Sequence, residues 1–199
     1  MQLSHSGGAT DVPLLAETIG ASLERAAAAY GDGEALVARH QGLRYTYAEL
    51  NAAVDELARG LLAIGLERGD RVGIWAPNCA EWVLVQFATA KLGVILVNVN
   101  PAYRTSELEY ALRQSGCRVL VAAREFKGSD YVAMVEEVAP SLDALERTIF
   151  LDGDDWDALI AGAASTDPAP SSSASQPSPR KIVRSSAGSD GATSSTIAT

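Results

Sequence analysis

Four short apolar segments, each followed by a helical pattern, constrain the fold of this chain more than any other feature. The segments are residues 71–75, 94–97, 118–122 and 148–151. The stretches between them have helical periodicity and end at Gly93, at Gly116 and near Val138, and a short helix is expected over 154–160. Uninterrupted apolar strands that alternate with helices are typical of a parallel sheet with right-handed crossovers and helices on both faces. The fold class is therefore α/β.

The first seventy residues supply further elements. Apolar and small residues at helical spacing predict a helix over 14–30, and residues 35–38 and 43–45 flank a turn and predict a β-hairpin. Thr46-Tyr47-Ala48-Glu49 has the pattern of a capping box, in which the hydroxyl and the carboxylate each bind a free backbone N–H, and Gly65 closes the helix that follows.

Two later helices have start signals of the same kind. Asn78-Cys79-Ala80-Glu81 predicts the start of the helix that ends at Gly93, and Ser106-Glu107-Leu108-Glu109 predicts a second capping box for the helix that ends at Gly116. The run 94–97 is continuously apolar, so we expect a strand covered on both faces.

The composition excludes several classes of function. A net charge of −9 over 199 residues argues against nucleic-acid binding, which needs concentrated Lys and Arg. The most apolar stretch, 82–99, is interrupted by polar residues, Lys91 among them, so no transmembrane segment is expected. Cys79 and Cys117 lie far apart without metal-ligand spacing, and the first residues lack a signal-peptide pattern, so we expect small core cysteines and a cytoplasmic protein.

Composition also divides the chain into three parts. We expect a flexible leader over 1–12 and an α/β domain over 13–164. Residues 165–199 are crowded with Ser, Ala, Thr, Gly and Pro and have few large aliphatic residues, which predicts a disordered tail.

The loops at the carboxyl ends of the strands are the place to look for chemistry, because open α/β sheets bind ligands there. The loops at 76–78 and 98–104 contain no glycine-rich phosphate cradle. Glu49, Glu81 and Glu109 lie where helix capping explains them. Acidic residues gather at 152–157, where charge at a helix N-terminus explains them better than a calcium loop does. We therefore predict no catalytic, cofactor-binding or metal-binding residue in this chain.

Several of these segments resemble adenylate-forming enzymes. Tyr45-Thr46-Tyr47-Ala48-Glu49-Leu50 is similar to the T-Y-x-E-L element near the start of acyl-CoA synthetases, luciferases and peptide-synthetase adenylation domains. Later family-like elements, in the order and spacing of the family, are Gly65-Leu66, Gly69-Asp70-Arg71-Val72, Ala76-Pro77-Asn78 and Glu81-Trp82, then Ala90-Lys91-Leu92-Gly93. The loop Asn98-Val99-Asn100-Pro101-Ala102-Tyr103-Arg104 looks most like fatty-acyl-CoA synthetases.

The resemblance, which covers about 14–160, implies the N-terminal part of an AMP-forming acyl-CoA synthetase. Such enzymes use ATP and Mg to convert a fatty acid to an acyl-adenylate with release of pyrophosphate, and coenzyme A then displaces AMP. The family's phosphate loop is expected soon after Ile160, but no Pro-Lys-Gly occurs, and the only Lys after Gly128 is Lys181. We therefore expect the chain to be inactive alone, with its tail out of frame or otherwise interrupted.

Two alternatives stay open. The chain could be a non-catalytic interaction module that forms a homodimer or pairs with a full-length synthetase. A stand-alone nucleotide-binding domain is the third reading, which the absence of glycine-rich loops disfavours.

Overall fold

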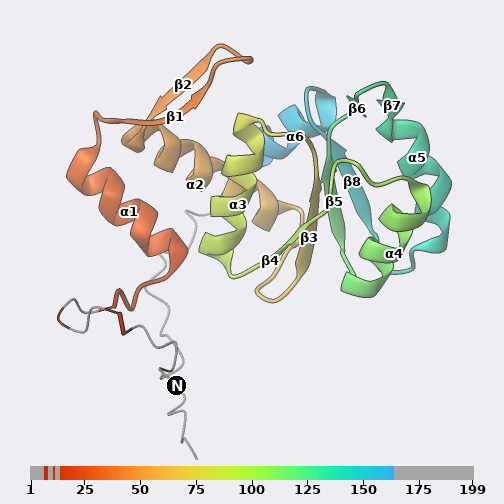
Figure 1. Cartoon of the computed structure of the whole chain (residues 1–199), viewed down its shortest axis with the longest axis horizontal. Helices are drawn as coiled ribbons and strands as arrows, with labels where there is room; N and C mark the ends of the chain where they lie inside the picture. The colour runs from red at the N-terminus through yellow and green to blue at the C-terminus, as the bar shows by residue number, and fades with distance from the viewer. Residues whose placement is uncertain (1–6, 9–10, 12–13, 164–199) are drawn as a thin grey trace, which may run out of the picture.

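A four-stranded parallel sheet forms the centre of the protein. The computed structural model describes residues 7–8, 11 and 14–163. Strands β3 (Arg71–Trp75), β4 (Ile95–Asn98), β5 (Val119–Ala122) and β8 (Arg147–Phe150) pair in the order β4-β3-β5-β8 (Figure 1). The predicted α/β class and parallel sheet are confirmed.

Helices cover both faces of this sheet, as predicted. Helices α2 (Tyr47–Ala63), α3 (Ala80–Leu92) and α6 (Asp154–Gly162) share one apolar core with one face of the sheet. Helices α4 (Thr105–Ser115) and α5 (Tyr131–Val138) form a second core on the opposite face. Side chains of β3 alternate between the two cores, because successive residues of a strand point to opposite faces: Ile74 faces the first and Trp75 the second.

The remaining elements lie around these layers. Helix α1 (Ile19–Tyr30) packs on α2 and α3, and the hairpin of β1 (Glu34–Ala38) and β2 (Leu43–Thr46) follows it. The two-residue strands β6 (Glu125–Phe126) and β7 (Ser129–Asp130) form a small hairpin that the sequence did not predict. A single 3-10 turn, η1 (Ala139–Ser141), follows α5. None of the helices within 14–163 combines the length and the apolar character needed to cross a bilayer.

Several helix boundaries match those predicted from the sequence. The capping box at Thr46 is confirmed: its hydroxyl accepts a bond from the N–H of Glu49, and its own N–H donates to the Glu49 carboxylate at 2.8 Å. Gly93 and Gly116 end α3 and α4 in the left-handed conformation, as expected. The predicted start of α1 at Leu14 was wrong. The helix begins at Ile19 because the Thr18 hydroxyl caps it, and Leu14 is 96% exposed.

Two predicted caps differ in the structure. Helix α3 begins at Ala80, within the predicted start, but its N-cap residue Cys79 makes no side-chain cap bond. Helix α4 begins at Thr105, and Glu107 accepts a bond from the N–H of Arg104 at 3.0 Å, so the box lies two residues earlier than predicted. Glu109 instead binds Arg113 and the Ser141 hydroxyl.

Strand β4 is less covered than its sequence suggested. It spans 95–98 and, among the described residues, pairs with β3 alone. Leu96 and Val97 pack against the cores on the two faces, but Ile95 is 52% exposed, so the strand is only partly covered, in contrast to the prediction. A continuous apolar run cannot reveal that the strand lies at the edge of the sheet, because strand order is set by the topology.

A buried lysine joins the three helices α1, α2 and α3. The Lys91 ammonium lies 2.5 Å from the Asp55 carboxylate and 3.2 Å from that of Glu24, and donates to the Asn51 amide oxygen at 2.9 Å. Its side chain is only 2% exposed. A buried charge needs partners of this kind to offset its lost hydration, and Gly20 gives it room, because a Cβ there would come within 2.8 Å of Lys91 Cγ.

Candidate functional site

The carboxyl edge of the sheet holds the loops in which a site is expected. The chain leaves β3 toward β4 on one side, whereas β5 connects to β8 on the other, so the strand order reverses between β3 and β5. Ligands of open α/β sheets bind outside such a reversal. The loops at this edge are 76–79, 99–104, 123–124 and 151–153.

The loop after β4 is held by two stacked aromatic rings. Trp75 and Tyr131 lie parallel, with ring centroids 3.5 Å apart and an interplanar angle of 4°. The Trp75 indole N–H donates to the carbonyl of Asn100 at 3.0 Å, and the Tyr131 hydroxyl donates to the carbonyl of Pro101. Burial raises the pKa of Tyr131, so its hydroxyl keeps the proton that it donates. The loop 99–104 is thus held by hydrogen bonds to the adjacent backbone carbonyls of Asn100 and Pro101.

Further hydrogen bonds of Asn100 and Arg104 fix the conformation of the loop 99–104. The Asn100 side chain accepts a bond from the N–H of Ala102 at 2.9 Å, the buttressing role that its sequence predicted. Arg104 binds the Ser129 hydroxyl in the β6–β7 hairpin. The bond from the Arg104 N–H holds the pKa of Glu107 below its usual range, so this carboxylate is ionised and committed to the start of α4.

The loop after β3 is built around Cys79 and the distant Gln41. The Gln41 side chain accepts a bond from the N–H of Ala80 at 2.7 Å and donates to the Glu81 carboxylate at 2.8 Å. Burial raises the pKa of Cys79 to about 12, so its thiol is protonated at neutral pH and is a poor nucleophile. Burial raises the pKa of Cys117 as well. Cys117 is buried, as expected of a small core residue, whereas Cys79 is half-buried against the first core.

The loop after β8 carries acidic residues that do not gather around a cation. Asp154, Asp155 and Asp157 lie in the first turn of α6, as predicted for charge at a helix N-terminus. Within the described part of the chain, no group of three His, Cys, Asp or Glu side chains is arranged to hold a metal ion. Asp152 has a left-handed backbone, with φ of 56°, which Asp tolerates in turns.

Arg124 is a feature of this edge that the sequence reasoning missed. Its guanidinium lies over the Phe150 ring, 5.4 Å from the centroid, and so close to Gly153 that a Cβ there would lie 2.4 Å from Nη2. The position directly after a buried strand was the available signal. An exposed cation at this edge can attract an anion, but no glycine-rich loop beside it offers backbone N–H groups to a phosphate.

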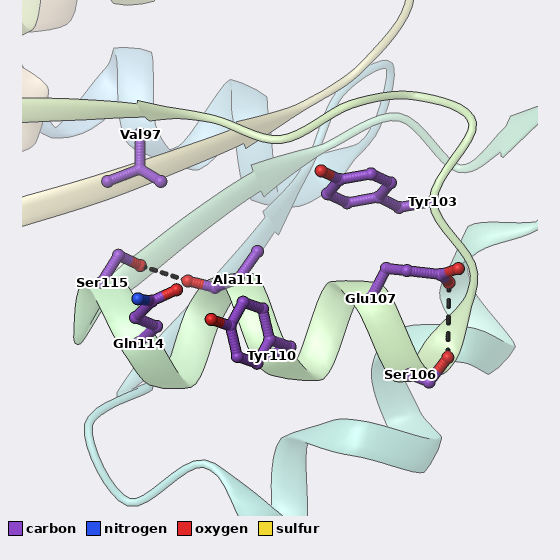
Figure 2. A pocket seen from close by; sticks show the side chains of 8 residues that line it. All are labelled: Val97, Tyr103, Ser106, Glu107, Tyr110, Ala111, Gln114 and Ser115. Carbon is purple, nitrogen blue, oxygen red and sulfur yellow. Dashed lines mark hydrogen bonds between the residues drawn. The ribbon is translucent and has the colours of Figure 1, made fainter.

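An open groove lies between β4 and α4, next to the end of the loop 99–104. Its volume is about 580 Å³. Figure 2 shows Val97 of β4 on one side, helix α4 on the other, and Tyr103 of the loop 99–104 near one end. The lining residues are Val97, Tyr103, Ser106, Glu107, Tyr110, Ala111, Gln114 and Ser115. Tyr110 is 65% exposed, so the groove opens to solvent along the free side of β4.

Comparison with known proteins identifies the family. The sequence profile of the AMP-binding enzyme family matches residues 23–187. The chain belongs to this family. Its relatives include the mitochondrial medium-chain acyl-CoA ligase ACSF2 of Mus musculus, 48% identical over 141 residues, which are 71% of this chain and 23% of the relative. The Danio rerio protein of the same name is 45% identical over 140 residues, 70% of this chain and 23% of the relative. This family member thus spans about a quarter of the length of these relatives.

Solved structures agree with the family assignment. A Mycobacterium tuberculosis fatty acyl CoA synthetase is 25% identical, with a TM-score of 0.65 over 77% of this chain and 29% of the other. A long-chain-fatty-acid-CoA ligase, FadD1, from Archaeoglobus fulgidus gives a TM-score of 0.70 over 83% of this chain and 33% of the other; at 21% identity it supports the fold alone. The resemblance to acyl-CoA synthetases that the motifs indicated is confirmed.

The family assignment does not by itself place a catalytic residue in this chain. Among the candidate carboxylates, Glu49 belongs to the capping box of α2, Glu81 binds Gln41, and Glu109 binds Arg113. The absence of catalytic, cofactor-binding and metal-binding residues therefore stays a prediction.

Proposed function

We propose that this chain supplies the N-terminal part of an AMP-forming fatty-acid–CoA ligase. In the complete protein, the carboxylate of a fatty acid attacks the α-phosphate of ATP, pyrophosphate leaves, and the thiol of coenzyme A then displaces AMP. The observation that carries the proposal is the 48% identity to a medium-chain acyl-CoA ligase over 71% of this chain. Acyl chain length is not part of the proposal.

We propose further that the isolated chain does not catalyse this reaction. The described residues do not fit ATP or Mg: they hold no cluster of metal ligands, and no glycine-rich loop follows a strand. Stabilisation of a transferring phosphoryl group needs convergent cations and backbone donors. At the carboxyl edge, Arg124 alone cannot supply this, so no step of the reaction is assigned to residues of the chain.

Two measurements test these proposals. The purified 199-residue chain is incubated with ATP, Mg, coenzyme A and fatty acids, and pyrophosphate release and acyl-hydroxamate formation are followed; turnover above background would refute inactivity. A chimera then joins residues 14–163 of this chain to the part of the mouse ligase that follows its matched region. Activity of the chimera on a medium-chain fatty acid supports the synthetase role, whereas a folded but inactive chimera counts against it.

The alternative is a non-catalytic module that pairs with a second copy or with a full-length synthetase. The outer edge of β4, which no other described strand covers, and the groove beside it favour this alternative, because both offer a surface for another polypeptide. Co-purification of a synthetase with the tagged chain would support pairing. Sedimentation of the chain as a monomer, without a co-purifying synthetase, would count against it.

The proposed boundaries and location have separate tests. We propose a leader over 1–12, an AMP-binding part over 13–164 and a Ser-rich tail over 165–199. The tail and most of the leader lie outside the described residues. The family match runs on to residue 187. Translation of the surrounding DNA in all frames tests the out-of-frame origin of the tail, which is wrong if no phosphate loop follows in any frame.

Cell fractionation tests the proposed cytoplasmic location against the mitochondrion that the animal relatives' names give.

A further inference from the structure

Helix α1 buries little of its surface against the rest of the protein. Of its twelve residues, Gly20 and Leu23 are buried, whereas Ile19 and Tyr30 are 58% and 65% exposed. Residues 26–29 are four alanines, whose short side chains add little apolar contact. The apolar hold on α1 therefore centres on Leu23, which joins the core that α2 and α3 share.

The bonds that shape α1 lie within its own segment. The Thr18 hydroxyl accepts a bond from the N–H of Ala21 at 3.1 Å, which caps the helix. Arg25 pairs with Glu17 at 2.6 Å. Neither interaction involves α2 or α3, so detachment of 17–30 as one unit breaks neither of them.

A short link with two glycines joins α1 to β1 and supplies a pivot. The Gly31 carbonyl accepts a bond from the N–H of Ala48 at 3.0 Å, at the start of α2. The Gly33 carbonyl accepts one from the N–H of Tyr47 at 2.9 Å. The link is thus fixed to α2, and rotation takes place between Tyr30 and Gly31. Hinges are short segments of this kind, in which few residues absorb the change in dihedral angles.

The ion network of Lys91 is divided unequally between α1 and α2. Asp55 and Asn51, both on α2, lie 2.5 and 2.9 Å from the ammonium. Glu24 of α1 lies at 3.2 Å, and its side chain is 37% exposed. If α1 moves away, the ammonium keeps its two nearer partners and gains water in place of Glu24. A buried charge left without partners would oppose such a movement, and here no charge is left in that state.

The seat of α1 is the Lys91 side chain itself. An added Cβ on Gly20 would lie 2.8 Å from Cγ of Lys91 and 3.2 Å from its Cα. Because the Cα belongs to the backbone of α3, it cannot rotate away as a side-chain atom can. Closed α1 covers Lys91, whose side chain is 2% exposed, and the position of α1 decides whether this amine meets solvent.

We propose that α1 is a latch: it swings away from α2 and α3 as one unit about the link 31–33, uncovers Lys91 and closes again, while the sheet stays folded. This inference goes beyond the proposed function and does not depend on it. In the open state, Lys91 and the face of α2 and α3 beneath α1 become part of the protein surface. Access to the Lys91 amine is thereby controlled by α1.

Amine labelling of the folded 199-residue chain tests the latch. Acetylation by N-hydroxysuccinimidyl acetate is followed by mass spectrometry at Lys91 and at the exposed Lys127. We expect Lys91 to react about 100-fold more slowly than Lys127, while the amides of 119–122 in β5 stay protected from exchange. Labelling that occurs only together with exchange in β5 would overturn the proposal, because the opening would then be global unfolding. Labelling of Lys91 as fast as Lys127 would overturn it too, since no closed state would exist.

Two variants of α1 separate detachment from fraying of the helix. Ala favours a helix about fivefold over Gly, so Gly20→Ala strengthens α1 as a helix while its Cβ blocks the seat on Lys91. We expect Gly20→Ala to speed labelling of Lys91 about tenfold, and Leu23→Ala to speed it more, with β5 protected in both. Slower labelling in Gly20→Ala would mean that α1 frays, and would overturn the proposal. Should Leu23→Ala fail to fold, Gly20→Ala decides alone.

Matched charge variants test the unequal network. A detached helix of twelve residues is marginal in water, so amide exchange over 23–28 reports opening. Glu24→Gln weakens a partly exposed pair that opening breaks, and we expect exchange over 23–28 to quicken about threefold. Asp55→Asn changes a partner that Lys91 keeps in both states, so exchange there should stay the same. A larger effect of Asp55→Asn than of Glu24→Gln would overturn the proposal.

Discussion

Gln41 caps helix α3 from the turn of a hairpin 39 residues earlier in the chain, its side-chain oxygen 2.7 Å from the backbone nitrogen of Ala80. The N-cap residue itself, Cys79, makes no such bond. The β1–β2 hairpin is therefore tied to the first turn of α3, beside the carboxyl edge of the sheet. A free N–H at a helix start needs a partner, and here a distant residue provides it.

Gln41→Ala is expected to destabilise the protein by about 1 kcal/mol, the usual effect of losing a helix cap. Urea unfolding measures the change. Cys79→Ser places a capping hydroxyl at the N-cap itself, so in the Gln41→Ala background it should recover part of the loss. A loss that Cys79→Ser leaves unchanged would mean that Gln41 acts through its bond to Glu81 instead.

The elements that the sequence predicted correctly have local signals. The Thr46 capping box, the closing glycines Gly93 and Gly116 and the alternation of strands and helices all come from residues that are neighbours in the chain. Features that depend on distant pairs were missed. The cap from Gln41 is one, and the exposure of β4 is another, because the order of strands decides which of them lies at an edge.

The candidate site was predictable to the same extent. The sequence located the loop 98–104 and the role of Asn100, whose partner is two residues away. It gave no signal for the stack of Trp75 on Tyr131, which come together only when β3 and α5 pack. Nothing in the sequence indicated that Lys91 would be a buried, paired cation, since its carboxylate partners lie on two other helices.

Tyr131→Phe tests the hold on this loop. The variant keeps the ring stacked on Trp75 but removes the hydroxyl that donates to Pro101. We expect a loss of about 1 kcal/mol in the free energy of unfolding, as for one hydrogen bond whose acceptor stays partly buried. Faster amide exchange confined to 99–104 should accompany it. Tyr110→Phe, at an exposed position, is the control and should change neither quantity.

Gly60→Ala tests the close contact of α2 with α6. Ala favours an exposed helix by about 1 kcal/mol over Gly, yet here the added Cβ would lie 2.3 Å from the carbonyl oxygen of Leu159. The backbone of α6 must move away, so we expect net destabilisation by about 1–3 kcal/mol, the usual effect of overpacking. Calorimetry or urea unfolding measures it. A stabilised Gly60→Ala variant would show that α6 does not rest on α2 as described.

Alkaline pH tests the environment of Cys79. Burial raises the pKa of its thiol to about 12, above the ordinary value of 9.0 that applies in the unfolded chain. The folded state therefore favours the protonated thiol. The contribution of the protonated Cys79 thiol to stability is fully present below pH 9 and is lost as the pH rises from 9 toward 12, because the unfolded chain releases this proton first.

The free energy of unfolding of the natural chain should fall relative to that of Cys79→Ala between pH 9 and 10.5, and the difference between the two free energies should be constant from pH 7 to 8.5. A difference that stays constant to pH 10.5 would place this thiol in contact with water, and rapid alkylation of Cys79 in the folded chain at pH 8 would lead to the same conclusion.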